Sequence, residues 1–119
     1  MNHFHFPSAA VPETIDFYTK HFAFREIATL GKTHVLRDDK GFLLAIDESA
    51  EGDPPSKARH LGFHLEGKRA VLELFLRLKP MVKSPLIEPS PRVIHFYCED
   101  PSGNRLEIGW YHFEKAYLY

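Results

Sequence analysis

The sequence is poor in the features that mark secreted, membrane-spanning or metal-thiolate proteins. Its single cysteine, Cys98, can form neither an internal disulfide nor a thiolate zinc cluster. No run approaches the roughly eighteen consecutive apolar residues of a membrane-spanning helix. The first residues also lack the positively charged segment and apolar stretch of a secretory signal. These absences predict a cytoplasmic protein.

An excess of positive charge is missing as well. Lys and Arg number 15 against 16 Asp and Glu, and the formal net charge is −1. Binding to phosphates requires clustered cations, so neither nucleic acid nor a membrane surface is expected as a partner. With 44% hydrophobic and 26% charged residues in a chain of 119, the composition predicts one globular domain over residues 1–119 that binds a small molecule.

The first half of the chain reads as a βαβββ module over residues 1–48. His3 and His5 alternate with Phe4 and Phe6, which indicates a short strand with both histidines on one face. Apolar residues at helical spacing predict a helix over 11–21. Three strands are expected next, separated by two glycine-containing turns, at residues 24–29, 34–37 and 42–47.

The pattern restarts after residues 49–58, a polar stretch with a Pro pair that we interpret as a linker. Module two, residues 59–119, is expected to contain a strand at 59–65, a helix at 68–79 ended by Pro80, and strands at 93–99 and 105–111. Residues 81–87 contain a proline and are expected to form only a short or edge strand.

The two halves can be aligned residue by residue. His3 and His60 begin equivalent strands, and the turn at 38–41 matches the turn at 100–103, which places Ala45 at the position of Glu107. Neither module can easily bury its sheet alone. We therefore predict an α+β fold in which two βαβββ modules pair into a curved mixed sheet enclosing a metal-binding cavity.

Pairing about a pseudo-twofold axis would bring His3, His60 and Glu107 together at the centre of the cavity. Two imidazoles and one carboxylate with open positions form the facial ligand set of non-haem Fe(II) enzymes, and they also suit Mn(II) or Zn(II). The sequence therefore predicts one divalent metal ion, with Fe(II) as the first choice.

The chain resembles the vicinal-oxygen-chelate superfamily of glyoxalases, bleomycin-resistance proteins and extradiol dioxygenases over essentially its whole length. The resemblance rests on NHFHF and IDFYTKHFAFREI at the start, RHLGFHL at the restart and EDPSGNRLEIGWY at the end. It implies that His3, His60 and Glu107 are the metal ligands, that the modules form a U-shaped cavity, and that the protein is a homodimer.

Two positions separate the branches of this superfamily. Glyoxalase I uses a fourth carboxylate ligand where this chain has Ala45, although Asp47 lies two residues further along the same strand face. The spacing from Phe96-Tyr97 through Asp100-Pro101 to Glu107 resembles the signature of type I extradiol dioxygenases. That resemblance implies that the Tyr97 hydroxyl contacts the substrate.

The leading hypothesis is a metal-dependent dioxygenase that binds its substrate through adjacent oxygens. Tyr97 would stabilise the developing oxyanion, and His64 or His95 would transfer a proton. A lyase, isomerase or thiol transferase on the same site is the first alternative, although the sequence shows no pocket rich in lysine and arginine near its end to match the fosfomycin-modifying transferases. A metal-free protein that sequesters an aromatic or drug-like ligand is the second. For Tyr97, His64 and His95, a purely structural role in packing is the alternative interpretation.

Overall fold

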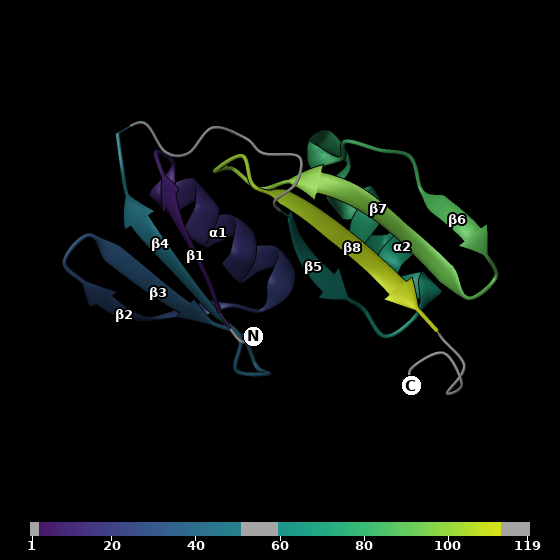
Figure 1. Cartoon of the computed structure of the whole chain (residues 1–119), viewed down its shortest axis with the longest axis horizontal. Coiled ribbons are helices and arrows are strands. Elements are labelled where there is room, and N and C mark those ends of the chain that lie inside the picture. The colour runs from purple at the N-terminus through teal and green to yellow at the C-terminus, as the bar shows by residue number, and fades with distance from the viewer. Residues whose placement is uncertain (1–2, 51–59, 113–119) are drawn as a thin grey trace. The chain divides into compact units, whose positions relative to one another are not determined.

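The computed structural model describes residues 3–50 and 60–112 (Figure 1). Its contacts divide the chain into two compact units. The first unit comprises Met1–Pro55 with Asp100–Gly103, and the second comprises Ser56–Glu99 with Asn104–Tyr119. The predicted linker at 49–58 falls largely outside the described residues. In the described part of the chain, no helix is long and apolar enough to cross a membrane.

The first unit is a βαβββ module. Its elements are β1 (His3–Ser8), α1 (Val11–Phe22), β2 (Arg25–Leu30), β3 (Thr33–Arg37) and β4 (Leu43–Glu48). The strands form a mixed sheet in the order β1-β4-β3-β2, in which β1 runs parallel to β4. Apolar side chains are buried beneath α1, and Pro12 and Glu13 occupy its first turn, where both residue types are favourable.

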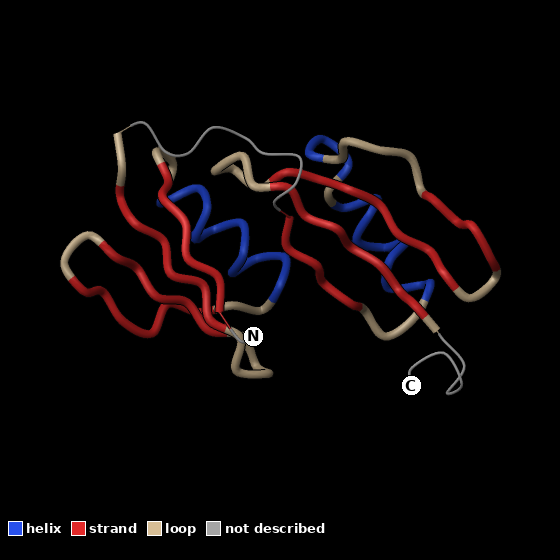
Figure 2. The backbone as a smooth tube through the Cα atoms, viewed as in Figure 1, coloured by secondary structure: helices blue, strands red, loops and turns tan. Residues whose placement is uncertain are grey.

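The second unit repeats this order. Its elements are β5 (His60–His64), α2 (Lys68–Arg77), a 3₁₀ turn (Lys79–Met81), β6 (Ile87–Ser90), β7 (Val93–Glu99) and β8 (Arg105–Tyr111). The sheet order is β5-β8-β7-β6 (Figure 2), and the arrows of Figure 1 show that β5 runs parallel to β8. The prediction of an α+β fold with two βαβββ modules is therefore confirmed. The enclosure of a cavity between them stays a prediction.

The strand registers confirm the residue-by-residue repeat. His3 pairs with Leu43 in the first unit, and His60 pairs with Arg105 in the second. Because Ala45 and Glu107 each lie two residues beyond these partners, they occupy equivalent positions. The two preceding turns also match, since Gly41 and Gly103 both have positive φ angles, 88° and 86°.

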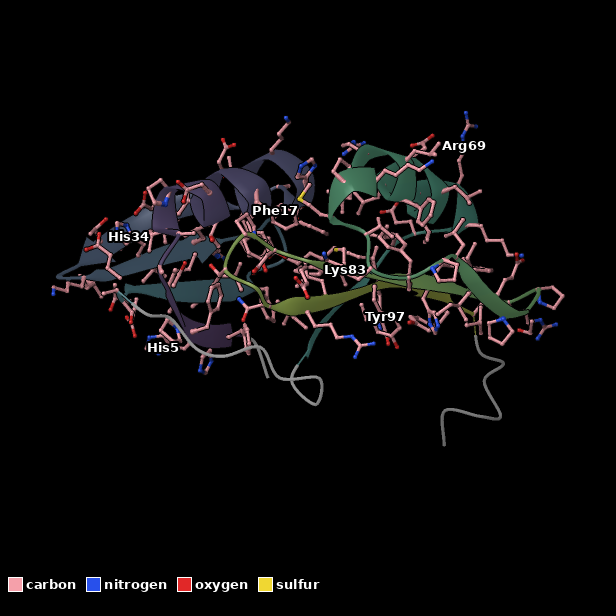
Figure 3. The ribbon with its side chains drawn as sticks, turned by 90° about the horizontal axis from the view of Figure 1, so that it is seen from above. His5, Phe17, His34, Arg69, Lys83 and Tyr97 are labelled. Atoms are coloured by element: carbon pink, nitrogen blue, oxygen red, sulfur yellow. The ribbon has the colours of Figure 1, made fainter. Side chains whose placement is uncertain are left out.

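Burial alternates along the strands and defines two faces in each sheet. In β7 and β8 the side chains of Phe96, Leu106 and Ile108 are completely buried, and α2 packs against both strands. Residues between them, such as Tyr97 and Glu107, therefore lie on the opposite face, which we call the helix-free face. Figure 3 shows Tyr97 on the side of the sheet away from the helices.

The structure corrects two predictions in the second unit. The helix α2 ends at Arg77 rather than at residue 79, because Pro80 has no N–H to continue the helical hydrogen bonds and the chain tightens into the 3₁₀ turn at Lys79–Met81. The predicted strand at 81–87 is replaced by an isolated bridge between Val82 and Cys98, and β6 begins only at Ile87. The reason is local: the Tyr97 amide donates to the Ser84 hydroxyl at 2.9 Å, and the next residue is a proline.

A buried hydrogen bond attaches the 100–103 turn to α1 inside the first unit. The fully buried Tyr18 donates its hydroxyl to Asp100 Oδ2 at 2.5 Å, and Asp100 is itself 4% exposed. We expect Tyr18→Phe to lower the free energy of unfolding by roughly 1–3 kcal/mol, because it removes a donor from a buried carboxylate. Denaturant titration measures this, with the exposed Thr29→Val as control; an unchanged midpoint for Tyr18→Phe would contradict it.

A second polar cluster in the first unit predicts a pH-dependent contribution to stability. His34 Nδ1 lies 2.7 Å from Glu26 Oε2, and Nε2 lies 3.0 Å from Glu48 Oε1. Hydrogen bonds from Glu48 and then Glu26 raise the pKa of His34 above its ordinary value, and the bond to His34 lowers the pKa of Glu26. The imidazolium is therefore favoured in the folded state.

This cluster should stabilise the fold below the ordinary histidine pKa of about 6.5 and lose its effect as pH rises through the raised value. At the acidic end, the contribution is lost as pH falls through the lowered pKa of Glu26. NMR titration should show that Glu48→Gln brings the His34 pKa down. A His34 pKa that is the same in both proteins would contradict the assignment.

Candidate functional site

Glu107 is the centre of a hydrogen-bonded cluster on the helix-free face of the second unit. Tyr97 pairs with it across β7 and β8, and the Tyr97 hydroxyl donates to Oε1 at 2.8 Å. The Tyr111 hydroxyl donates to Oε2 at 2.6 Å. Both oxygens of the carboxylate thus accept a phenolic hydrogen bond, which fixes the direction in which Glu107 points. The pairing follows from the position of the 100–103 turn, which lies midway between Tyr97 and Glu107 in the sequence.

Sequence reasoning did not single out Tyr111. It follows Glu107 by four residues along β8, so the two side chains share a face. Gly109 lies between them, and a Cβ atom built on it would come within 2.6 Å of Tyr111 Cε2. The tyrosine ring therefore occupies the space above the glycine. The spacing Glu-X-Gly-X-Tyr was the signal that could have revealed this contact.

The predicted His95 and His64 both contact Tyr111. His95 Nδ1 lies 3.0 Å from the Tyr111 hydroxyl, and the His64 ring centroid lies 5.0 Å from that of Tyr111. The structure thus brings together three of the predicted site residues, Tyr97, His64 and His95, around Glu107. Their catalytic roles remain predictions.

The environment keeps both phenols protonated. The hydrogen bond to Glu107, followed by burial, raises the pKa of Tyr97. Burial is the larger cause for Tyr111, whose pKa rises strongly, with the hydrogen bond to Glu107 second. Both residues therefore act as hydrogen-bond donors and not as anions near neutral pH.

A cleft of about 300 Å³ lies beside this cluster and is lined by Lys83, Tyr97, Glu99 and Arg105. The Arg105 guanidinium lies over the Tyr97 ring, 4.1 Å from its centroid. The Lys83 amide donates to the Tyr97 carbonyl at 2.8 Å, which anchors that segment beside β7. Two cations and one carboxylate give the cleft a positive balance, a feature that the sequence did not reveal.

The first unit places His3 and His5 at alternate positions of β1, and both are exposed. His5 Nε2 lies 2.7 Å from Asp47 Oδ2, and the Thr33 hydroxyl donates to the other oxygen of Asp47. The bond from Thr33, and then that from His5, lowers the pKa of Asp47. Asp47 is thus a carboxylate held by residues of its own sheet.

The predicted metal ligands are described only in part. The backbone of His60 lies in β5 opposite Arg105, whereas its side chain is outside the described part of the structure. Among the side chains that are described, no group of three His, Cys, Asp or Glu residues could hold a metal ion. The convergence of His3, His60 and Glu107 therefore stays a prediction.

Comparison with protein families identifies the chain. The model of the Glyoxalase/Bleomycin resistance protein/Dioxygenase superfamily matches residues 1–108. The chain belongs to this superfamily. Its members include metal-dependent enzymes such as lyases and glyoxalases, and a search of curated proteins gave no match.

Solved structures of superfamily proteins share the fold. A possible glyoxalase from Bacillus cereus is 28% identical with a TM-score of 0.75, over 91% of this chain and 96% of the other. The fosfomycin resistance protein FosX from Listeria monocytogenes, complexed with Mn(II) and dihydroxypropylphosphonic acid, is 20% identical with a TM-score of 0.78, over 98% and 96%. A lactoylglutathione lyase from Agrobacterium tumefaciens is 18% identical with a TM-score of 0.70, over 92% of each chain.

Proposed function

We propose that the protein is an enzyme dependent on a divalent metal ion, which His3, His60 and Glu107 hold. The observation that carries the proposal is the double hydrogen bond from Tyr97 and Tyr111 to Glu107. Carboxylates that ligate metals are characteristically oriented by such partners. The equivalence of His3 and His60 in the strand registers supports their assignment as the other two ligands.

The donor set fits such an ion. Two imidazoles and one carboxylate suit Fe(II), Mn(II) or Zn(II), and they leave positions open for a substrate. A bound ion of this kind polarises substrate oxygens and, as Fe(II), supports reaction with O₂. The Mn(II) complex of FosX supports a metal site in this fold.

The activity we propose is dioxygenation of a substrate that presents two adjacent oxygens, with Fe(II) as the metal. The spacing from Tyr97 through the Asp100-Pro101 turn to Glu107 favours this activity over the others. On substrate binding, the Tyr97 hydroxyl would turn its single proton from Glu107 Oε1 to the negative charge on the substrate. His95, which is hydrogen-bonded to Tyr111, would receive the substrate proton. His64, whose ring contacts that of Tyr111, is the second candidate for this role.

The cleft with Lys83 and Arg105 favours a second candidate, a lyase, isomerase or thiol transferase acting on an acidic substrate. Its two cations lie next to Tyr97, where they would attract a carboxylate or phosphonate group. Arg105→Gln should then raise KM for acidic substrates much more than for neutral ones of similar size. An equal effect on both classes would remove this candidate.

Metal analysis of protein purified without chelator is the first test. We expect about one equivalent of divalent metal per chain, removed by chelator and restored by Fe(II), Mn(II) or Zn(II). Oxygen uptake with a panel of catechols after anaerobic loading with Fe(II) then tests dioxygenation. A protein that binds no metal but retains an aromatic ligand would contradict the proposal and favour a sequestering role.

We also propose that the protein is a homodimer. Mixing two variant subunits tests whether each metal site takes its ligands from both chains. His3→Ala and Glu107→Gln each remove one ligand. If His3 of one chain and Glu107 of the other share a site, random mixing of the two variants should restore about a quarter of the wild-type capacity. About half of the dimers are then mixed, and each mixed dimer has one intact site of two. If each site lies within one chain, the mixture should bind no more metal than the separate variants.

A further inference from the structure

A continuous hydrogen-bonded chain joins His95 to Glu107 through Tyr111. His95 Nδ1 lies 3.0 Å from the Tyr111 oxygen, and that oxygen lies 2.6 Å from Glu107 Oε2. All three residues belong to the second unit, on the adjacent strands β7 and β8. The chain starts at a residue that sequence reasoning proposed for proton transfer and ends at a proposed metal ligand.

The positions of the protons in this chain follow from its chemistry. An ionised carboxylate can only accept hydrogen bonds, and a phenol has a single proton to donate. At 2.6 Å the Tyr111 proton must therefore lie towards Glu107, because two oxygen atoms without a proton between them would repel each other. The Tyr111 oxygen can then interact with His95 only as an acceptor, so His95 Nδ1 carries a hydrogen.

The rings around His95 hold this arrangement in place. The Tyr111 ring centroid lies 5.8 Å from that of His95, and the Tyr97 ring lies 5.6 Å away on the same strand. Gly109 leaves the space that the Tyr111 ring occupies. Because any larger residue would displace the ring, this arrangement of His95, Tyr111 and Glu107 requires Gly109.

We propose that Tyr111 is a positioning residue that holds neutral His95 in its Nδ1–H tautomer and so leaves Nε2 as the proton acceptor of the site. In the reaction, a substrate O–H bond breaks and an N–H bond forms at Nε2. The resulting imidazolium is stabilised through Tyr111 by the negative charge of Glu107. The assignment of the tautomer stands on the geometry alone, whereas its use in catalysis rests on the proposed function.

Nitrogen NMR of the histidine rings in the metal-free protein tests the tautomer directly. At a pH where the ring nitrogen signals show neutral His95, we expect the Nδ1–H form with Nε2 unprotonated. In Tyr111→Phe this preference should fall by roughly tenfold, because one hydrogen bond is lost. Tyr97→Phe is the matched control: it removes the other phenol from Glu107 but keeps the chain to His95, so the tautomer should not change.

Gly109→Ala provides a second variant in case Tyr111→Phe does not fold. The added Cβ should push the Tyr111 ring aside and weaken the tautomer preference while the tyrosine remains present. A wild-type His95 in the Nε2–H form would overturn the inference, and so would a preference unchanged in both variants. Failure to bind metal would instead overturn the proposed function and leave the tautomer result standing, so the two failures are distinguishable.

Discussion

Glu107→Gln is expected to weaken the binding of a divalent metal ion by about a hundredfold or more. The amide is neutral and a poor ligand, whereas a carboxylate contributes both charge and a strong oxygen donor. The change is nearly isosteric: one of the two phenols can still donate to the amide oxygen, and the oxygen of the other can accept from the amide NH₂ group. The loss should therefore appear in the dissociation constant, measured by competition with a chelator, with little change in the folded state.

Glu99→Gln is the matched control for this experiment. Glu99 lies on β7, pairs with Arg105 across the strands and lines the neighbouring cleft. It should change metal affinity by less than about threefold, because Glu99 is not one of the proposed ligands and solvent in the cleft that it lines screens its charge. Equal affinities for Glu107→Gln and the wild type would show that Glu107 is not a ligand.

Tyr97→Phe is expected to lower turnover by roughly ten- to a thousandfold once a substrate is known, because it removes a donor to charge that develops during the reaction. The phenyl ring keeps its packing beneath Arg105. Tyr111 still holds the second oxygen of Glu107, so metal content should be nearly unchanged. Single-turnover rates and metal content of the two proteins are the measurements.

The outcome separates two roles for the Tyr97 hydroxyl. Loss of metal in Tyr97→Phe would show that its bond to Glu107 supports the metal site rather than the substrate. Unchanged metal content with equal rates would show that the Tyr97 hydroxyl has no role in catalysis and that its ring only lines the cleft. Tyr111→Phe provides the comparison, because it removes the hydroxyl that donates to the other oxygen of the Glu107 carboxylate.

The parts of the fold that were predicted correctly are those fixed by local chemistry. The bounds of β7 and β8 follow from the turn at 100–103, and that turn also sets the pairing of Tyr97 with Glu107. The segment after α2 was predicted wrongly because its pairing depends on the Ser84 side chain, which replaces a backbone partner. The spacing of apolar residues along the sequence does not reveal a hydrogen bond between a backbone amide and a side chain.

The candidate site could be predicted only where it follows the strand pattern. Glu107 was found through the repeat and the family resemblance, Tyr97 through the spacing of that resemblance, and His95 because alternation places it on the same face as Tyr97. Tyr111 was missed because its contact depends on the empty space above Gly109, which is a property of packing. Lys83 was missed because it lies outside the regular strands, in a segment that only the tertiary structure places beside Tyr97.

The identical register of the two modules suggests how such a protein can gain or lose chemistry. In the first unit, Val35 pairs with Ala45 where the second unit pairs Tyr97 with Glu107. The backbone frame is the same at this pair of positions, where the second unit carries polar side chains and the first carries apolar ones. After a duplication, each copy can drift through single-residue replacements on its helix-free face while the buried side keeps the module folded. New activities in this architecture would then require few mutations and no new backbone.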